Sequence, residues 1–234
     1  MTEAAWLACT FSTPMFEWLR EQGLGSHRQR LLLGLACCRQ VMHLMSAAGS
    51  MAVEVAERFF AGSATEAERW EAFDDAGLAM DESDDLRRHK ADWCAYRVVQ
   101  LAGEEGRPAS WHDDLAAMIA QTAPEAFAWT GTAWDEAILN VHRAEIAGLV
   151  RDVFGNPFRP PPPLFPAALG WNDGTVPRIA QGIYADRAPE RLPVLADALL
   201  DAGCHNDELV QHFRSGGPHV IPGCWGVDLI LGRH

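Results

Sequence analysis

The chain has 234 residues, of which 48% are hydrophobic and 22% charged, a balance typical of globular proteins with room for one large domain or two small ones. Its net charge is −13, and the segment 66–85 alone holds nine acidic residues and one basic residue, Arg69. Such a surface repels phosphate backbones and anionic lipid headgroups, so composition argues against nucleic acid and membrane surfaces as partners.

The cysteines and the N-terminal residues predict a cytoplasmic protein. The first residues, MTEAAW, include an acid, and the apolar run from Leu31 to Cys38 is too short and too internal for a secretory leader. None of the six cysteines forms a C-x-x-C pair. We therefore expect reduced thiols, most of them buried as small apolar side chains, Cys37 and Cys38 among them.

Helical spacing dominates residues 1–154. Ser12-Thr13-Pro14 predicts the start of a helix that ends near Gly23, and Ser26 caps a longer one over 27–48. That second helix is apolar on almost every face, which is typical of a central helix. No segment shows the alternation of a strand. The remaining helices of this predicted bundle cover 50–61, 65–80 (with a capping box at Thr65), 84–102, 110–122 and 134–154.

The composition changes after residue 154 from helical spacing to a proline-rich stretch. Four consecutive prolines within 156–166 exclude a helix interior and predict an extended strap that packs on its own domain. Short helices are expected beyond it, over 175–185, 189–202, 206–213 and 225–231. The predicted fold is all-α: a helical bundle at 1–154, then a proline-rich strap and a smaller helical lobe at 155–234, either separate from the bundle or continuous with it.

The aromatic residues suggest where the core lies. The chain has nine tryptophans, and a tryptophan supplies a large apolar area with a single N–H to satisfy, so most are expected to be core anchors. The final helix, 225–231, is apolar enough to need burial, and Trp225 is predicted to be largely inaccessible.

Several segments together suggest a relationship: TEAAWLAC, RLLLGLACCRQVMHLM, LVRDVFGNPFRP, IAQGIYADRAPERLPVLADALLDAGC and GPHVIPGCWGVDLILG. In these the chain resembles a family of uncharacterised helical proteins from planctomycetes such as Gemmata, some of them loosely labelled SMI1/KNR4-type. The family pattern H-x-R-G-C-W is replaced here by a longer loop from His219 to Trp225. The resemblance implies a helical fold and a cytoplasmic location, and it brings no activity with it.

One region is rich in metal-ligand residue types: Cys204, His205, His212, His219 and Cys224. Their spacing lacks the paired knuckle of structural zinc sites, and a continuous helix would place Cys204 and His212 about 12 Å apart. Two interpretations stay open. Either Cys204, His212, His219 and Cys224 form a zinc site, or glycines and caps merely turn the chain between short helices.

Familiar catalytic motifs are absent from the sequence. There is no G-x-G-x-x-G, Walker A loop, G-x-S-x-G or H-E-x-x-H, and no Glu-x-x-His pair of a di-iron bundle. This favours a non-enzymatic interaction or scaffold protein that binds a protein partner through helix surfaces and needs no cofactor. The alternative is an enzyme or metal-dependent protein with a Cys/His zinc site in the C-terminal lobe.

Overall fold

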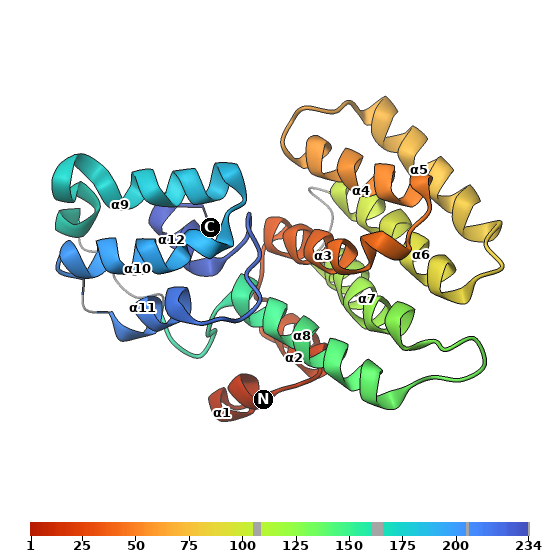
Figure 1. The fold of residues 1–234 in the computed structure, drawn as a ribbon, viewed down its shortest axis with the longest axis horizontal. Coiled ribbons are helices and arrows are strands. Elements are labelled where there is room, and N and C mark those ends of the chain that lie inside the picture. The colour runs from red at the N-terminus through yellow and green to blue at the C-terminus, as the bar shows by residue number, and fades with distance from the viewer. Residues whose placement is uncertain (105–108, 161–165, 205, 234) are drawn as a thin grey trace. The chain divides into compact units, whose positions relative to one another are not determined.

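The computed structural model describes residues 1–104, 109–160, 166–204 and 206–233 (Figure 1). In these ranges the regular elements are twelve α-helices and two short 3₁₀ helices, with one isolated bridge between Trp129 and Trp134. The predicted all-α fold is confirmed. No helix among the described residues is both long and apolar enough to cross a membrane.

The chain divides into two compact units, residues 3–150 (unit 1) and residues 151–234 (unit 2). The division falls inside α8, whose last turn belongs to unit 2, whereas the sequence predicted a boundary after residue 154. Residues 161–165 of the predicted proline strap lie outside the described residues. Each unit is described by itself below.

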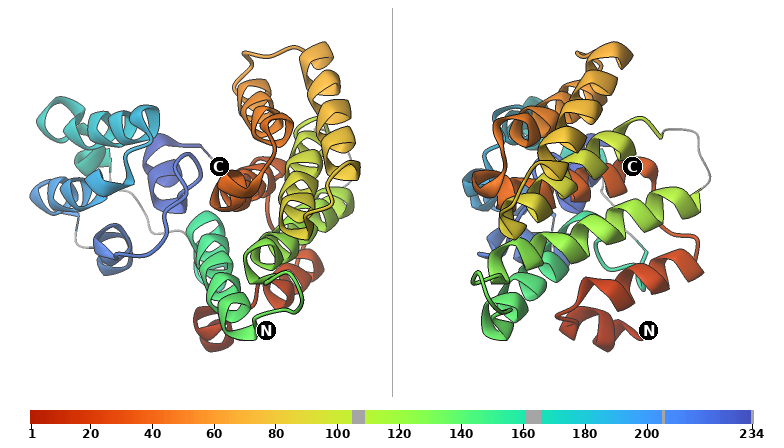
Figure 2. Two further views of the ribbon diagram at one scale, coloured as in Figure 1. Left: turned by 45° about the vertical axis from the view of Figure 1, so that its right-hand side comes forward. Right: turned by 90° about the vertical axis from the view of Figure 1, so that its right-hand side faces the viewer.

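Unit 1 is a bundle in which α6 packs against α4, α5 and α7, and α7 packs against α2 and α3 (Figures 1 and 2). The buried thiols of Cys37, Cys38 and Cys94 lie in its core, as expected for Cys37 and Cys38. Its helices are α1 (Glu3–Ala8), α2 (Ser12–Glu21), α3 (His27–Val41), α4 (Ala47–Phe60), α5 (Glu66–Asp81), α6 (Leu86–Ala102), α7 (Ala109–Ala128) and α8 (Glu136–Phe154), with η1 at Met42–Leu44.

The prediction of one continuous helix over 27–48 is wrong, because the helix ends at Val41 and α4 begins at Ala47. Asp92 on α6 accepts hydrogen bonds from the backbone N–H and the hydroxyl of Ser46, at 2.9 and 3.0 Å. The Ser46 hydroxyl in turn caps α4 by accepting from the N–H of Gly49. A tertiary contact therefore holds the residue that caps α4, after α3 has ended at Val41. The capping box predicted at Thr65 is confirmed, and α7 continues past the predicted end at 122 with Pro124 inside it.

Unit 2 packs α9 against α10 and α12, and α11 against α10 and α12. Its apolar core includes Ile183, Leu195, Leu209, Phe213 and Val227. The helices are α9 (Pro166–Asp186), α10 (Leu192–Asp201), α11 (Asp207–Arg214) and α12 (Trp225–Leu231), with η2 at Pro189–Arg191. A kink at 171–174 interrupts α9, so its regular second half starts near the predicted Thr175.

The prediction that most tryptophans anchor the core holds fully for only one of the described tryptophans, because five others are half-buried and two are exposed. Trp6 is fully buried, but Trp70 and Trp134 are exposed. Trp70 instead lies under the Arg69 guanidinium, 4.3 Å from it, which uses the aromatic face without burying it. Trp225 is only half-buried, against expectation, although α12 does dock through the buried Val227 and Ile230.

Candidate metal centre

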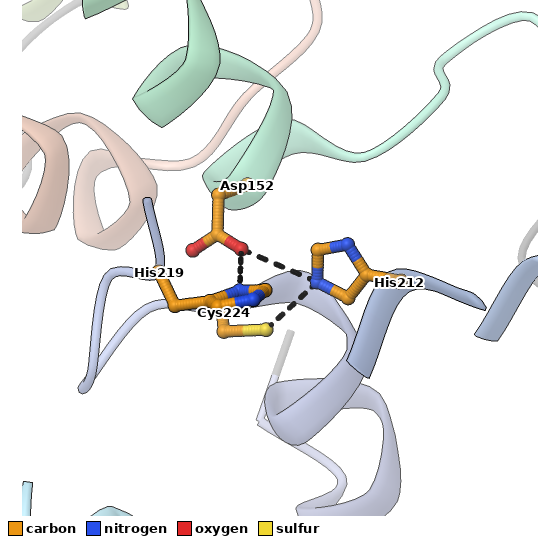
Figure 3. A group of neighbouring side chains, drawn as sticks. All are labelled: Asp152, His212, His219 and Cys224. Atoms are coloured by element: carbon orange, nitrogen blue, oxygen red, sulfur yellow. Dashed lines mark hydrogen bonds and ion pairs between the residues drawn. The ribbon is translucent and has the colours of Figure 1, made fainter. Parts of the chain in front are cut away.

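Unit 2 brings four ligand-type side chains together: Asp152, His212, His219 and Cys224 (Figure 3). One oxygen, two imidazole nitrogens and one sulfur, a single atom from each residue, all lie within 4.8 Å of one another. The Asp152 carboxylate and the Cys224 thiol are buried, and the two histidine side chains are almost so.

Each side chain is placed by a different local feature. Asp152 lies in the last turn of α8, and His212 lies in α11, which starts at the Asn206 cap. Cys224 is the residue directly before α12, and His219 lies in the loop between α11 and α12. Four short elements therefore converge on one point.

Gly226 allows α12 to come this close to α11. A Cβ at Gly226 would lie 2.8 Å from the Phe213 ring and 2.9 Å from the Leu209 side chain, both on α11. Only a residue without a side chain fits at that separation. The close approach holds Cys224, at the start of α12, beside His212.

The shortest contacts within the group all involve Oδ1 of Asp152 or Nε2 of His212. Oδ1 of Asp152 lies 2.8 Å from Nδ1 of His219 and 3.2 Å from Nε2 of His212. The same Nε2 of His212 lies 3.1 Å from Sγ of Cys224. Ligand atoms around tetrahedral zinc stand about 3.3–3.8 Å apart, given bonds of about 2.0–2.3 Å. The group is thus close to the spacing that an ion needs.

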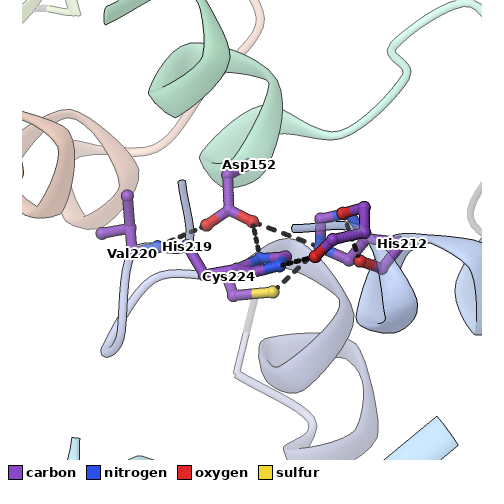
Figure 4. Close-up of polar contacts among 6 residues, drawn as sticks. Asp152, His212, His219, Val220 and Cys224 are labelled. Atoms are coloured by element: carbon purple, nitrogen blue, oxygen red, sulfur yellow. Dashed lines mark hydrogen bonds and ion pairs between the residues drawn. The ribbon is translucent and has the colours of Figure 1, made fainter. Parts of the chain in front are cut away.

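A second layer of hydrogen bonds orients two of the four side chains (Figure 4). Nε2 of His219 lies 3.2 Å from the carbonyl oxygen of Ser215, which can only accept, so this nitrogen carries the proton and Nδ1 is left to face the centre. Oδ2 of Asp152 accepts from the Val220 N–H at 2.6 Å, which leaves Oδ1 for the centre. Metal-binding histidines and carboxylates are typically held in this way.

The ionisation of the group follows from burial and mutual contact. Burial opposes the charge on Asp152, but hydrogen bonds and charge from His212 and His219 outweigh it and hold the pKa of the carboxyl below its ordinary value. Burial also opposes the charge on His219 and so lowers its pKa. The contacts with Asp152 outweigh burial and raise the pKa of His219 above its ordinary value. Without an ion, these contacts therefore favour the protonated form of His219 beside the Asp152 carboxylate.

Cys224 is held as a thiol in the absence of an ion. Burial and the nearby Asp152 charge raise its pKa well above the ordinary value, and the backbone N–H groups of Val227 and Gly226 at the start of α12 oppose this in part. A divalent cation would reverse the balance, because a coordinating thiol loses its proton outright.

The geometry argues against a cysteine–histidine–aspartate relay. In such a relay the imidazole uses one nitrogen for the nucleophile and the other for the acid. Here Cys224 and Asp152 both approach the same atom, Nε2 of His212. One nitrogen cannot serve both partners as a relay, whereas an ion between them would satisfy both.

The sequence-predicted candidates divide into two groups. His212, His219 and Cys224 meet in this group, and Cys204 does not. Cys204 follows α10 with its side chain in the apolar core and its N–H bonded to the Leu199 carbonyl. His205 lies outside the described residues.

Sequence reasoning missed Asp152. Its signal is an acid one residue before the buried Val153 and one turn after the buried Leu149. A carboxylate in such a position needs a buried partner, but the sequence does not reveal that the partner comes from 60 or more residues away.

Comparison of the chain with known protein families, with curated proteins and with solved structures finds no match. The resemblance to planctomycete proteins stays a prediction.

Proposed function

We propose that unit 2 binds one zinc ion through Asp152, His212, His219 and Cys224. The observation that carries the proposal is the convergence of four ligand atoms of zinc's preferred kinds within 4.8 Å of one another. The orientations of His219 and Asp152 also support the proposal. The hydrogen bond to the Ser215 carbonyl leaves Nδ1 of His219 facing the centre, and the hydrogen bond from the Val220 N–H leaves Oδ1 of Asp152 facing it.

The donor set favours zinc over the hard cations. Magnesium and calcium prefer all-oxygen sites, whereas thiolate and imidazole suit zinc and similar transition metals. Charge also balances: one carboxylate and one thiolate offset a divalent cation, while the two imidazoles bind in neutral form. A neutral centre is the least costly to bury.

We further propose a structural role for the ion. Structural zinc sites take four protein ligands, whereas catalytic sites take three and leave a position for water or substrate. Four ligands in unit 2 favour the closed kind, and hence a non-enzymatic protein. A zinc-bound thiolate also needs reduced Cys224, in keeping with six free cysteines and a cytoplasmic location.

Metal content tests the proposal. Protein is purified without chelators, dialysed against micromolar zinc and then dialysed against zinc-free buffer. Elemental analysis should then find about one zinc per chain. The Cys224→Ser variant should lose it, and Cys204→Ser, which removes another buried thiol of the same unit, should keep it. Wild-type protein that takes up no zinc would refute the proposal.

A protein partner remains a second proposal, supported by the outer face of α5. Trp70 and Leu78 are 54% and 61% exposed there, among exposed acids that include Glu71, Asp74 and Asp75. Charge complementarity indicates a basic partner surface with an apolar centre. If so, capture of a purified partner should weaken with salt and fail for the Trp70→Ala/Leu78→Ala double variant, while its helical content stays unchanged.

A further inference from the structure

We infer that the ion acts as a clasp for the C-terminal segment of unit 2, so that metal loading decides whether the loop 215–223 and helix α12 stay docked. The inference rests on the proposed zinc site and concerns what the ion controls there.

The segment depends on its attachments. Helix α12 has seven residues, far fewer than the 12–15 or so that an isolated helix needs to be even marginally stable in water. The loop before it opens with exposed Gly216 and Gly217, where a Cβ would meet open space or a single distant atom. Neither stretch is stable without contacts to the rest of unit 2.

Polar attachments of the segment converge on Asp152. The His219 ring and the Val220 N–H both bond to this carboxylate, at 2.8 and 2.6 Å. One residue before α12, Cys224 meets His212 of α11 at 3.1 Å. Both ends of the loop–helix junction are thus fastened at the same group of side chains (Figure 4).

Apolar contacts add to these polar attachments in docking the segment. Val220, Ile221, Val227 and Ile230 are buried, so the segment has a seat in the core of unit 2. An ion bound to Asp152 of α8, to His212 of α11 and to His219 and Cys224 of the segment would keep the segment docked. Release of the segment would separate the ligands, so the undocked form binds the ion poorly and the ion favours the docked form.

Hydrogen exchange with mass spectrometry tests the inference on the full-length wild-type chain. One sample is stripped with chelator and dialysed, and the other holds free zinc at about 100 times its dissociation constant. A ligand that binds only the docked form at that concentration lowers the open population about 100-fold. Peptides from 215–231 should exchange up to about 100-fold more slowly with zinc, while peptides from α4 and α5 of unit 1 should not change.

The outcomes separate this inference from the zinc proposal. Zinc that binds stoichiometrically but leaves exchange of 215–231 unchanged, or slows the whole chain equally, overturns the clasp and leaves the site. Absence of zinc binding overturns both. The Cys204→Ser variant should behave like wild type, and Cys224→Ser should show fast exchange of 215–231 whether or not zinc is present.

Discussion

Nδ1 of His219 lies 2.8 Å from Oδ1 of Asp152, although 67 residues separate the two in sequence. The contact joins the last turn of α8 to the loop before α12 inside unit 2. Asp152 is buried and the His219 side chain is only 7% exposed, so little water reaches the pair and the carboxylate depends on its neighbours. The pair offers an ion a carboxylate oxygen and an imidazole nitrogen that already lie close together.

The Asp152→Ala substitution should destabilise unit 2 of the metal-free protein. It removes the acceptor of the Val220 N–H and leaves His219 without its counter-charge. Loss of one member of a buried pair costs about 3–5 kcal/mol. Urea denaturation followed by hydrogen exchange of peptides from unit 2 measures the effect.

Asp197→Ala is the matched control for that measurement. Asp197 pairs with Arg214 in the same unit, but both side chains are exposed, at 66% and 43%. Exposed pairs contribute about 0–1 kcal/mol. Equal losses of stability in the two variants would contradict a buried role for Asp152.

Cobalt should report the thiolate ligand directly. Co²⁺ added to metal-free wild-type protein is expected to give intense visible bands of a tetrahedral site and a thiolate-to-cobalt charge-transfer band in the near ultraviolet. Cys204→Ser should preserve both features. Cys224→Ser should lose the charge-transfer band, and a wild-type spectrum typical of octahedral cobalt would rule out the four-ligand centre.

The Gly226→Ala substitution tests the close approach of α12 to α11. The added methyl group would overlap the Phe213 ring and the Leu209 side chain. Overpacking of this kind costs about 1–3 kcal/mol, and the shift should move Cys224 away from His212 and weaken zinc binding as well. Thermal unfolding and zinc titration measure the two effects. Gly216→Ala, where the methyl group meets nothing within 4 Å, should leave both unchanged.

Asp92 should make unit 1 less stable as pH rises. Burial raises the pKa of this carboxyl above its ordinary value, against the opposing hydrogen bonds from Ser46. Between the unfolded pKa, about 3.9, and the raised folded pKa, the folded chain binds more protons than the unfolded chain. The contribution of Asp92 to the free energy of unfolding therefore falls as pH rises through this window and stays low above it.

The Asp92→Asn substitution removes that titration and keeps an oxygen that can accept from Ser46. Relative to wild type, the variant should gain stability as pH rises above the unfolded pKa of about 3.9, as measured by denaturant unfolding at each pH. The exposed Asp74→Asn serves as the surface control. A stability difference between Asp92→Asn and wild type that does not vary with pH would contradict the buried titration.

Local chemistry in the sequence determined much of the helical fold. The capping box at Thr65 and the start of α11 at Asn206 each depend on three or four residues, so the sequence alone predicts them, and α12 has the bounds expected from its spacing. Three of the four side chains in the candidate centre were also foreseeable, since His212, His219 and Cys224 lie within 13 positions of one another.

Tertiary structure decided what depends on partners distant in the sequence. At the break between α3 and α4, the capping residue Ser46 is held by Asp92, 46 residues away. Cys204 and Cys224 are both thiols at helix ends in the apolar core of unit 2, and only packing brings Cys224 to His212 and leaves Cys204 out of the candidate centre. Asp152 looks like any acid near a helix end until the chain folds back and gives it two imidazoles and a backbone N–H, because the energy that keeps a buried charge comes from its neighbours in space.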